Sequence, residues 1–235
     1  MRIIKSALAI ALVVIFVTNA MPKEAADTST ATAAKSAPAK EPVVIVESAA
    51  TKDAQTSGPV AIVQQTVVKV LRVLADPKYK DPSERRKLRD KIRSILLDVV
   101  DMKNISLLTL ANYRSKFSDE QFETFTKLFS QLLFSTYIIH LETYSDEKVV
   151  ITGIEKTSAS RARVKTKTVS STKEIPIEFG FAKADQKWTL YDVYIEGVSL
   201  VKNYRSQFRE ILLNKSSAQF LERLREKVKE NENKL

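Results

Sequence analysis

The hydrophobic residues of this chain change their spacing twice along the sequence, and this change limits the fold more than any other feature. Between residues 60 and 141 they recur with the helical period, between 148 and 195 they alternate as in strands, and from 198 onward the helical period returns. The pattern predicts helices over about 60–75, 83–100, 102–112, 118–141, 198–213 and 217–228, and strands over 148–154, 160–169, 174–182 and 187–195. We therefore expect an α+β fold, a single domain in which helices wrap one curved antiparallel sheet of about four strands.

Local motifs refine these elements. Ser83 follows a proline and is expected to cap the second helix, and Ser118 with Gln121 has the spacing of a capping box for the long helix 118–141. The second half of that long helix is apolar nearly all round, so we expect apolar surroundings on every side. In the last strand, alternation places Trp188, Leu190 and Tyr194 on one face and Tyr191, Val193 and Ile195 on the other.

The N-terminal segment has the organisation of a signal peptide. Arg2 and Lys5 precede an apolar stretch over residues 6–17, and Thr18-Asn19-Ala20 offers a cleavage site. The stretch is shorter than the roughly 20 residues of a spanning helix, so an uncleaved anchor is the less favoured alternative. We expect a signal peptide over residues 1–20 and secretion to the periplasm.

Residues 21–57 are rich in Ala, Thr, Ser, Lys, Glu and Pro, a composition typical of a disordered linker. The apolar run at residues 43–46 could add an edge strand, but the linker interpretation is favoured. The folded domain is expected over residues 58–232.

The residues required for most enzyme chemistry are missing. The sequence has no cysteine, one histidine and four scattered glycines, which excludes thiolate chemistry, cysteine-bound metals and glycine-rich phosphate loops. His140 is interpreted as a surface or cap residue. Asp192 and Glu196 would stand roughly 13 Å apart on a strand, too far for a glycosidase pair, and are expected to satisfy local hydrogen bonds or basic neighbours. We expect no catalytic site, no metal and no cofactor.

The net charge of +10 lies mostly in the folded part. Basic residues dominate segment 78–93, and the strand 160–169 directs Arg161, Arg163, Lys165 and Lys167 to one face. Nucleic acid is not expected as a partner, because only Tyr79 could stack with bases in the basic segment. Anionic lipid headgroups and acidic protein surfaces remain candidates, beside the simpler interpretation of a solvated face.

The apolar faces exceed what a small core needs. They could form one large core, or they could leave a cavity between sheet and helices for an apolar ligand. The residues alone leave both possibilities open.

Two blocks of sequence resemble a known family. Residues 188–208 read Trp-Thr-Leu-Tyr-Asp-Val-Tyr-Ile-Glu-Gly-Val-Ser-Leu-Val-Lys-Asn-Tyr-Arg-Ser-Gln-Phe, and residues 102–137 contain Tyr113, Ser118, Gln121 and several phenylalanines. Both are similar to blocks of the MlaC family of toluene-tolerance proteins, with similarity over about residues 60–230. Where that family has Leu-Gly-x-Tyr and an aromatic, this chain has Leu110-Ala111-Asn112-Tyr113-Arg114, so the family's helix end and a pocket contact by residue 114 are not carried over.

The resemblance implies a periplasmic phospholipid carrier of bacterial lipid-asymmetry transport. It implies helices and sheet around a hydrophobic pocket for the acyl chains, with the headgroup near the surface. Its partners would be an outer-membrane lipoprotein–porin complex and an inner-membrane ABC transporter with its substrate-binding hexamer, and the carrier would be a monomer. From the apolar faces and the family blocks, the predicted lipid-binding residues are Tyr113, Leu132, Leu133, Tyr137, Val193, Ile195, Val198, Leu200, Val201, Tyr204 and Phe208.

Two alternatives stay open. One is a related carrier for another lipid, such as a hopanoid. The other is a protein-interaction subunit of a transport complex, with a filled core and no ligand.

Overall fold

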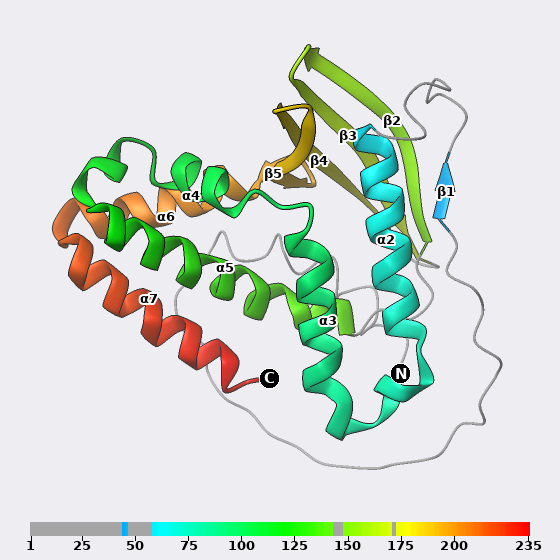
Figure 1. Cartoon of the computed structure of the whole chain (residues 1–235), viewed down its shortest axis with the longest axis horizontal. Coiled ribbons are helices and arrows are strands. Elements are labelled where there is room, and N and C mark those ends of the chain that lie inside the picture. The colour runs from blue at the N-terminus through cyan, green and yellow to red at the C-terminus, as the bar shows by residue number, and fades with distance from the viewer. Residues whose placement is uncertain (1–43, 47–57, 143–147, 171–172) are drawn as a thin grey trace.

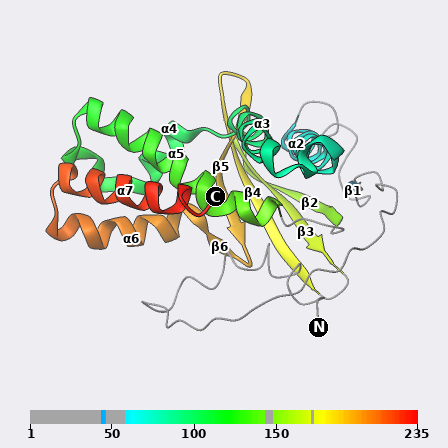
Figure 2. The ribbon, with the colours of Figure 1, turned by 90° about the horizontal axis from the view of Figure 1, so that it is seen from below.

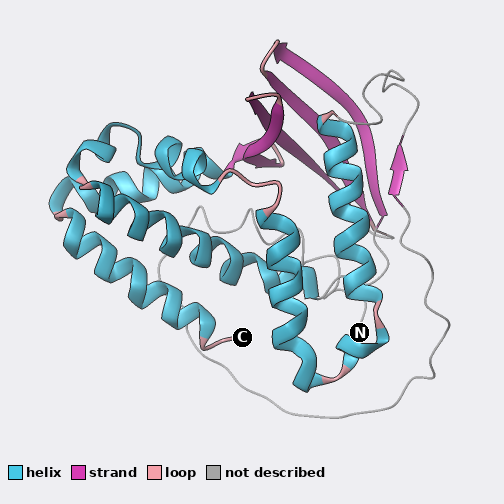
Figure 3. Ribbon diagram, viewed as in Figure 1, coloured by secondary structure: helices cyan, strands magenta, loops and turns pink. Residues whose placement is uncertain are grey.

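The computed structural model describes residues 44–46, 58–142, 148–170 and 173–235. The predicted signal peptide lies outside the described residues, and so does the predicted linker apart from residues 44–46. The described part has the expected α+β fold, with the strands gathered in one sheet and the helices beside it (Figure 3).

All the predicted helices and strands are present, with shifted ends. The helices are α2 (Pro59–Ala75), α3 (Arg85–Leu97), α4 (Met102–Leu110), α5 (Asp119–Glu142), α6 (Leu200–Asn214) and α7 (Ser217–Glu232), and the 3₁₀ turns are η3 (Pro77–Lys80), η4 (Pro82–Glu84) and η5 (Ala111–Lys116). The strands are β1 (Val44–Val46), β2 (Lys148–Ser158), β3 (Arg161–Val169), β4 (Glu174–Ala184), β5 (Lys187–Ile195) and β6 (Val198–Ser199).

Side-chain hydrogen bonds determine two of the helix starts. The capping box before α5 is confirmed: the Gln121 N–H donates to Ser118 Oγ at 3.2 Å and the Ser118 N–H donates to Gln121 Oε1 at 3.1 Å. The predicted cap at Ser83 is wrong. Its N–H instead donates to Asp81 Oδ1 at 2.8 Å, an Asx turn that closes η4, and α3 begins only at Arg85.

The strands form one sheet in the order β1-β2-β3-β4-β5-β6. Strands β2 to β5 make the predicted antiparallel meander. The short β6 adds to β5 through Ile195 and Val198, so α6 begins at Leu200 rather than at residue 198. β1 pairs with β2 in parallel, with Val44 opposite Val149. For residues 44–46 the edge-strand alternative, rather than the disordered linker, therefore describes the structure.

The helices fall into two groups around the sheet (Figures 1 and 2). α2 and α3 lie together, and α2 packs against β2 and β3. α4, α5, α6 and α7 form a bundle that extends away from the β5 side of the sheet, and α4 and α6 are the members that contact β5. The sheet is therefore covered by different helices at its two ends.

A β-bulge in β5 corrects the predicted faces of that strand. Asp192 pairs with Gly180 and Leu190 with Phe181, so Tyr191 is an extra residue in β5. The Leu190 N–H and C=O bond to Val99 O and the Asp101 N–H, at 2.8 and 3.0 Å, which ties the bulge to the segment between α3 and α4. After the bulge the alternation changes phase, because one extra residue moves every later side chain to the opposite face.

Four separate hydrophobic clusters make up the core of the described part. The largest joins α4, α5, α6 and α7, and its rings of Phe125, Phe129, Phe208 and Phe220 lie 5.1–5.9 Å apart between centroids. The second joins α2 to β2, β3 and β4, and the third joins α2, α3 and the end of α5. The fourth is small and centres on Ile175 and Ile195 of β4 and β5. The apolar residues thus do not merge into one large core.

Candidate functional site

The inner face of the sheet, defined here as the face of Ile177, Phe179, Val193 and Ile195, carries apolar side chains on both β4 and β5. Ile177 pairs with Ile195 and Phe179 with Val193, so that these side chains stand beside each other across the strands. Because of the bulge, Leu190 lies on this face as well, opposite Phe181.

Much of this inner face is incompletely covered. Ile177 and Phe179 on β4 and Leu190 and Val193 on β5 are only half-buried. The small cluster around Ile195 gathers Ile177, Val193 and Leu200, and none of its members belongs to α5. Apolar surface that stays partly open in this way is suited to an apolar ligand.

The second half of α5 also keeps apolar side chains partly open. Leu132 and Ile138 are buried, but Leu133, Phe134 and Tyr137 are half-buried and Ile139 is 38% exposed. The expectation of apolar cover on every side of this helix is therefore wrong: α5 packs on α7 and its end packs on α2 and α3 through Ile138, but these helices leave part of its surface open. The side chain of His140, predicted to be a surface or cap residue, lies outside the described part.

Two tyrosines meet between α5 and α6. Burial raises the pKa of Tyr137 above its usual range, and the neighbouring Tyr204 hydroxyl adds to the shift. Burial also raises the pKa of Tyr204, against hydrogen bonds with Tyr137 and Thr136 that lower it. Both hydroxyls stay neutral at physiological pH, so this part of the bundle holds polar groups without charge.

The structure divides the predicted lipid-binding residues into groups. Val193, Ile195 and Leu200 come together in the small cluster on the inner face. Most of the others belong to the bundle core or pack against it: Leu132, Val201, Tyr204 and Phe208 are buried there, and Tyr113 and Leu133 lie at its edge. Val198 is 43% exposed on β6. Tyr137 lies beside Tyr204, as described above.

Residues of β4 complete the inner face and were not among the predicted site residues. Ile175, Ile177 and Phe179 share this face with Val193 and Ile195. Their alternation with Pro176, Glu178 and Gly180 was visible in the sequence and identified a half-buried strand. Nothing in that alternation distinguishes a face covered by helices from one left open to a ligand.

Asp192 organises the junction between β5 and α6. Its carboxylate accepts hydrogen bonds from Ser199 Oγ at 2.6 Å and from the N–H groups of Val193 and Val201, at 2.9 and 3.1 Å. Ser199 in turn caps α6 by accepting the Lys202 N–H at 3.0 Å. This confirms the expectation of local hydrogen bonds for Asp192. Glu196 has the expected basic neighbour, because Lys173 Nζ lies 3.5 Å from its carboxylate.

The opposite face of the sheet is charged and internally paired. Arg163 bonds Glu178 at 3.2 Å, and Lys165 and Lys167 pair with Glu155 and Glu174 at 2.9 and 3.4 Å. The Arg161 and Arg163 guanidinium groups lie 5.2 and 4.2 Å from the ring centres of Tyr191 and Tyr194. These pairs explain how two tyrosines of β5 lie on a polar face.

The basic segment 78–93 is only partly neutralised. Arg89 forms a two-pronged pair with Glu142, at 2.5 and 3.0 Å, and also donates to Leu235 O at 2.7 Å. Glu84 lies within ion-pair distance of Lys78 and Lys87. Lys80, Arg85, Arg86 and Lys91 are exposed.

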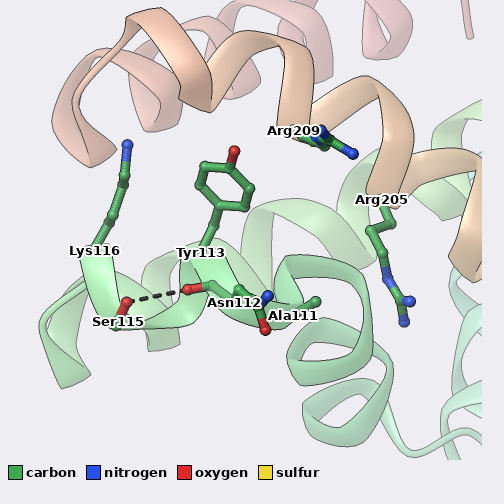
Figure 4. A pocket seen from close by; sticks show the side chains of 7 residues that line it. All are labelled: Ala111, Asn112, Tyr113, Ser115, Lys116, Arg205 and Arg209. Atoms are coloured by element: carbon green, nitrogen blue, oxygen red, sulfur yellow. Dashed lines mark hydrogen bonds between the residues drawn. The ribbon is translucent and has the colours of Figure 1, made fainter.

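A hollow of about 570 Å³ lies between η5 and α6, apart from the inner face (Figure 4). Its lining residues are Ala111, Asn112, Tyr113, Ser115, Lys116, Arg205 and Arg209. Tyr113 is therefore the one predicted site residue found in this hollow. Ala111, which stands where the family resembled by this sequence has glycine, has φ 48° and ψ −123°, a conformation that favours glycine. Arg114 points its guanidinium 4.4 Å from the ring centre of Phe122 and does not line the hollow.

The described residues offer neither a metal cluster nor a membrane-spanning helix. They contain no group of three or more His, Asp or Glu side chains placed to hold a metal ion. None of their helices combines the length and apolar character needed to span a membrane.

Comparisons with known proteins give a family match and a structural match. A family model described as MlaC protein matches residues 64–226. The fold is similar to that of a solved phospholipid-binding protein from Ralstonia solanacearum in complex with a phospholipid, with a TM-score of 0.64 and 20% sequence identity over 73% of this chain and 97% of that one. No curated protein matches in sequence.

Proposed function

Since the chain belongs to the MlaC family, we propose that it is a periplasmic phospholipid carrier that holds acyl chains against the inner face of β4 and β5. The family match over residues 64–226 carries this proposal. The phospholipid bound to the solved protein of similar fold supports it, as do the half-buried apolar side chains of Ile177, Phe179 and Val193.

The energetics favour such a surface. Each acyl CH₂ group left in water costs about 0.8 kcal/mol, so a carrier that crosses an aqueous compartment must shield most of both chains. Apolar side chains that remain half-buried in the protein alone gain burial when a lipid covers them. Shielding of this kind needs no catalytic group, and the proposed activity is binding rather than catalysis.

The carrier would exchange lipid between membrane complexes as an auxiliary component of an ABC transport system. Its proposed partners are the inner-membrane ABC transporter with its substrate-binding hexamer and the outer-membrane lipoprotein–porin complex, and it would work as a monomer. The signal-peptide pattern of residues 1–20 supports a periplasmic location. The predicted lipid-binding residues on the inner face, Val193, Ile195 and Leu200, would contact the acyl chains.

The test is to identify lipid that co-purifies with the protein by native mass spectrometry. A bound phospholipid supports the carrier, a bound polycyclic lipid supports the hopanoid alternative, and a consistently empty protein supports the interaction subunit. Val193→Trp should reduce the bound lipid because the larger ring occupies space beside Phe179 without burying a charge. Leu213→Trp is the control, since Leu213 is 58% exposed at the end of α6. Equal lipid in a folded Val193→Trp variant would remove the inner face from the site.

A further inference from the structure

The hollow between η5 and α6 is positively charged in a way that the proposed lipid site does not explain. It is lined by the side chains of Lys116, Arg205 and Arg209, and among the lining residues of the described chain none is acidic. Figure 4 shows Tyr113 and Lys116 extending from η5 towards α6, and Arg205 and Arg209 carried by α6 itself. The hollow therefore gathers cations from two elements around one space.

Two of these cations are held in place by the protein. Arg205 donates from Nε and Nη2 to Leu108 O, at 2.8 and 2.5 Å, and Lys116 Nζ donates to Leu212 O at 2.8 Å. Both acceptors are carbonyls at the C-terminal ends of helices, where cations are stabilised by the helix dipole. These contacts orient the two charges but do not neutralise them, because a backbone carbonyl carries no net charge.

The third cation, Arg209, differs from the other two. Arg209 is exposed and makes no hydrogen bond or ion pair with any residue of the described part. It follows Arg205 by four residues on α6, a spacing at which like charges on a helix repel each other. An anion between them would relieve this repulsion.

Neutral hydrogen-bonding groups and an unusual backbone accompany the charges. Asn112, Tyr113 and Ser115 line the same hollow; the Ser115 hydroxyl donates to Asn112 O at 3.1 Å, while the Asn112 amide and the Tyr113 hydroxyl stand beside the cations. Ala111 turns the chain from α4 into η5 with a positive φ of 48°, and this turn brings η5 alongside α6. Strained backbone of this kind is concentrated at functional sites.

From this arrangement we propose that the hollow binds a phosphate ester. The oxygens of its phosphate group can accept hydrogen bonds from these cationic side chains. The volume of about 570 Å³ exceeds that of a bare phosphate ion and leaves room for the esterified polar group. The site is separate from the acyl-chain surface, because its residues belong to η5 and α6 and none lies on β4 or β5.

Glycerol 3-phosphate, titrated into the isotope-labelled protein and followed by NMR, tests the proposal. We expect the backbone signals of residues 111–116 to shift, with binding weakened by added salt. Arg209→Gln should weaken binding about fivefold, the effect of losing one exposed charged contact. The matched control is Arg223→Gln on α7, which removes the same charge at another exposed site. Signals that do not shift, or an equal loss in both variants, would overturn the proposal.

A second measurement identifies the source of the phosphate ester. Flotation with phosphatidylcholine vesicles, with and without phosphatidylglycerol, tests a membrane headgroup. Binding that needs phosphatidylglycerol and falls in Arg209→Gln assigns the site to a lipid headgroup, whereas a response to glycerol 3-phosphate alone assigns it to a soluble ester. In either case the lipid that co-purifies with Arg209→Gln should match that of the unaltered protein in kind and amount. The proposal for this hollow and the proposal for the acyl-chain surface can therefore be refuted separately.

Discussion

Replacing Ala111 by glycine should stabilise the protein, because Ala111 occupies a conformation that normally requires glycine. Its φ of 48° and ψ of −123° match the first central position of a type II′ turn, where a Cβ atom is strained. A residue held in such a region costs about 1–3 kcal/mol. The Ala111 side chain is exposed, so its removal loses no buried contact.

The net gain is smaller than the strain, because glycine also increases the entropy of the unfolded chain. That term offsets roughly 0.5–1 kcal/mol. We therefore expect Ala111→Gly to raise the free energy of unfolding by about 1 kcal/mol. For a domain of this size the midpoint of thermal unfolding should rise by about 3 °C.

Urea unfolding followed by circular dichroism measures this difference, with an unchanged m-value as the sign that only stability has changed. The matched control is Ala218→Gly, since Ala218 is equally exposed but lies in the first turn of α7. Glycine there should destabilise by about 0.5–1 kcal/mol. If both variants lose stability alike, the backbone at Ala111 is not strained and the argument is refuted.

Three further changes test other parts of the structure. Asp192→Ala should lower the free energy of unfolding by about 2–4 kcal/mol in a urea titration. The change leaves the Val193 and Val201 N–H groups and the Ser199 hydroxyl without their acceptor. Arg89→Lys should lower the free energy of unfolding by about 1–2 kcal/mol in the same assay, because an ammonium group cannot reproduce the two-pronged contact with Glu142. Burial raises the pKa of Tyr194 to about 12, so the folded state keeps this proton while the unfolded state loses it near pH 10. Stability from Tyr194 should therefore be present below pH 10 and fall as the pH rises towards 12, and Tyr194→Phe should remove the phenolate absorbance that develops near pH 12.

Features that depend on neighbouring residues could be predicted from the sequence. The helices and the four-stranded meander follow from hydrophobic period, and the capping box of Ser118 and Gln121 from a short motif. The cap predicted at Ser83 is wrong although it rests on neighbouring residues. Asp81, two residues earlier, accepts the Ser83 N–H and caps a 3₁₀ turn over Pro82–Glu84, and the α-helix starts only at Arg85.

Features that depend on distant residues could not be predicted. The bulge at Tyr191 is tied to residues 99–101, which are far from β5 in the sequence. Once it is present, Leu190 shares a face with Val193 instead of opposing it. In the same way, the pairing of Val44 with Val149 joins segments about one hundred residues apart, and composition alone favoured a linker there.

The candidate site likewise has a part that the sequence predicts and a part that depends on distant residues. The apolar character of residues 193–208 was evident, but period alone could not separate Val193, which stays half-buried on the inner face, from Phe208, which fills the bundle core. Both have the same hydrophobic signal. Their surroundings differ in the folded chain: Phe208 packs against Phe125 of α5 and Phe220 of α7, whereas Val193 belongs to the small cluster on the inner face.

The two proposed sites use opposite sides of the same strand-to-helix connection. Asp192 and Ser199 fix the start of α6 to β5, close to the inner face. Further along, α6 carries Arg205 and Arg209 to the hollow. A helix anchored at one end by a buried carboxylate can hold both sites at a constant separation, so loss of the anchor should disturb both. Asp192→Ala, assayed in a folded fraction, should therefore reduce bound lipid and glycerol 3-phosphate affinity together, whereas Val193→Trp should reduce only the first. If Asp192→Ala leaves either property unchanged, the connection does not couple the sites.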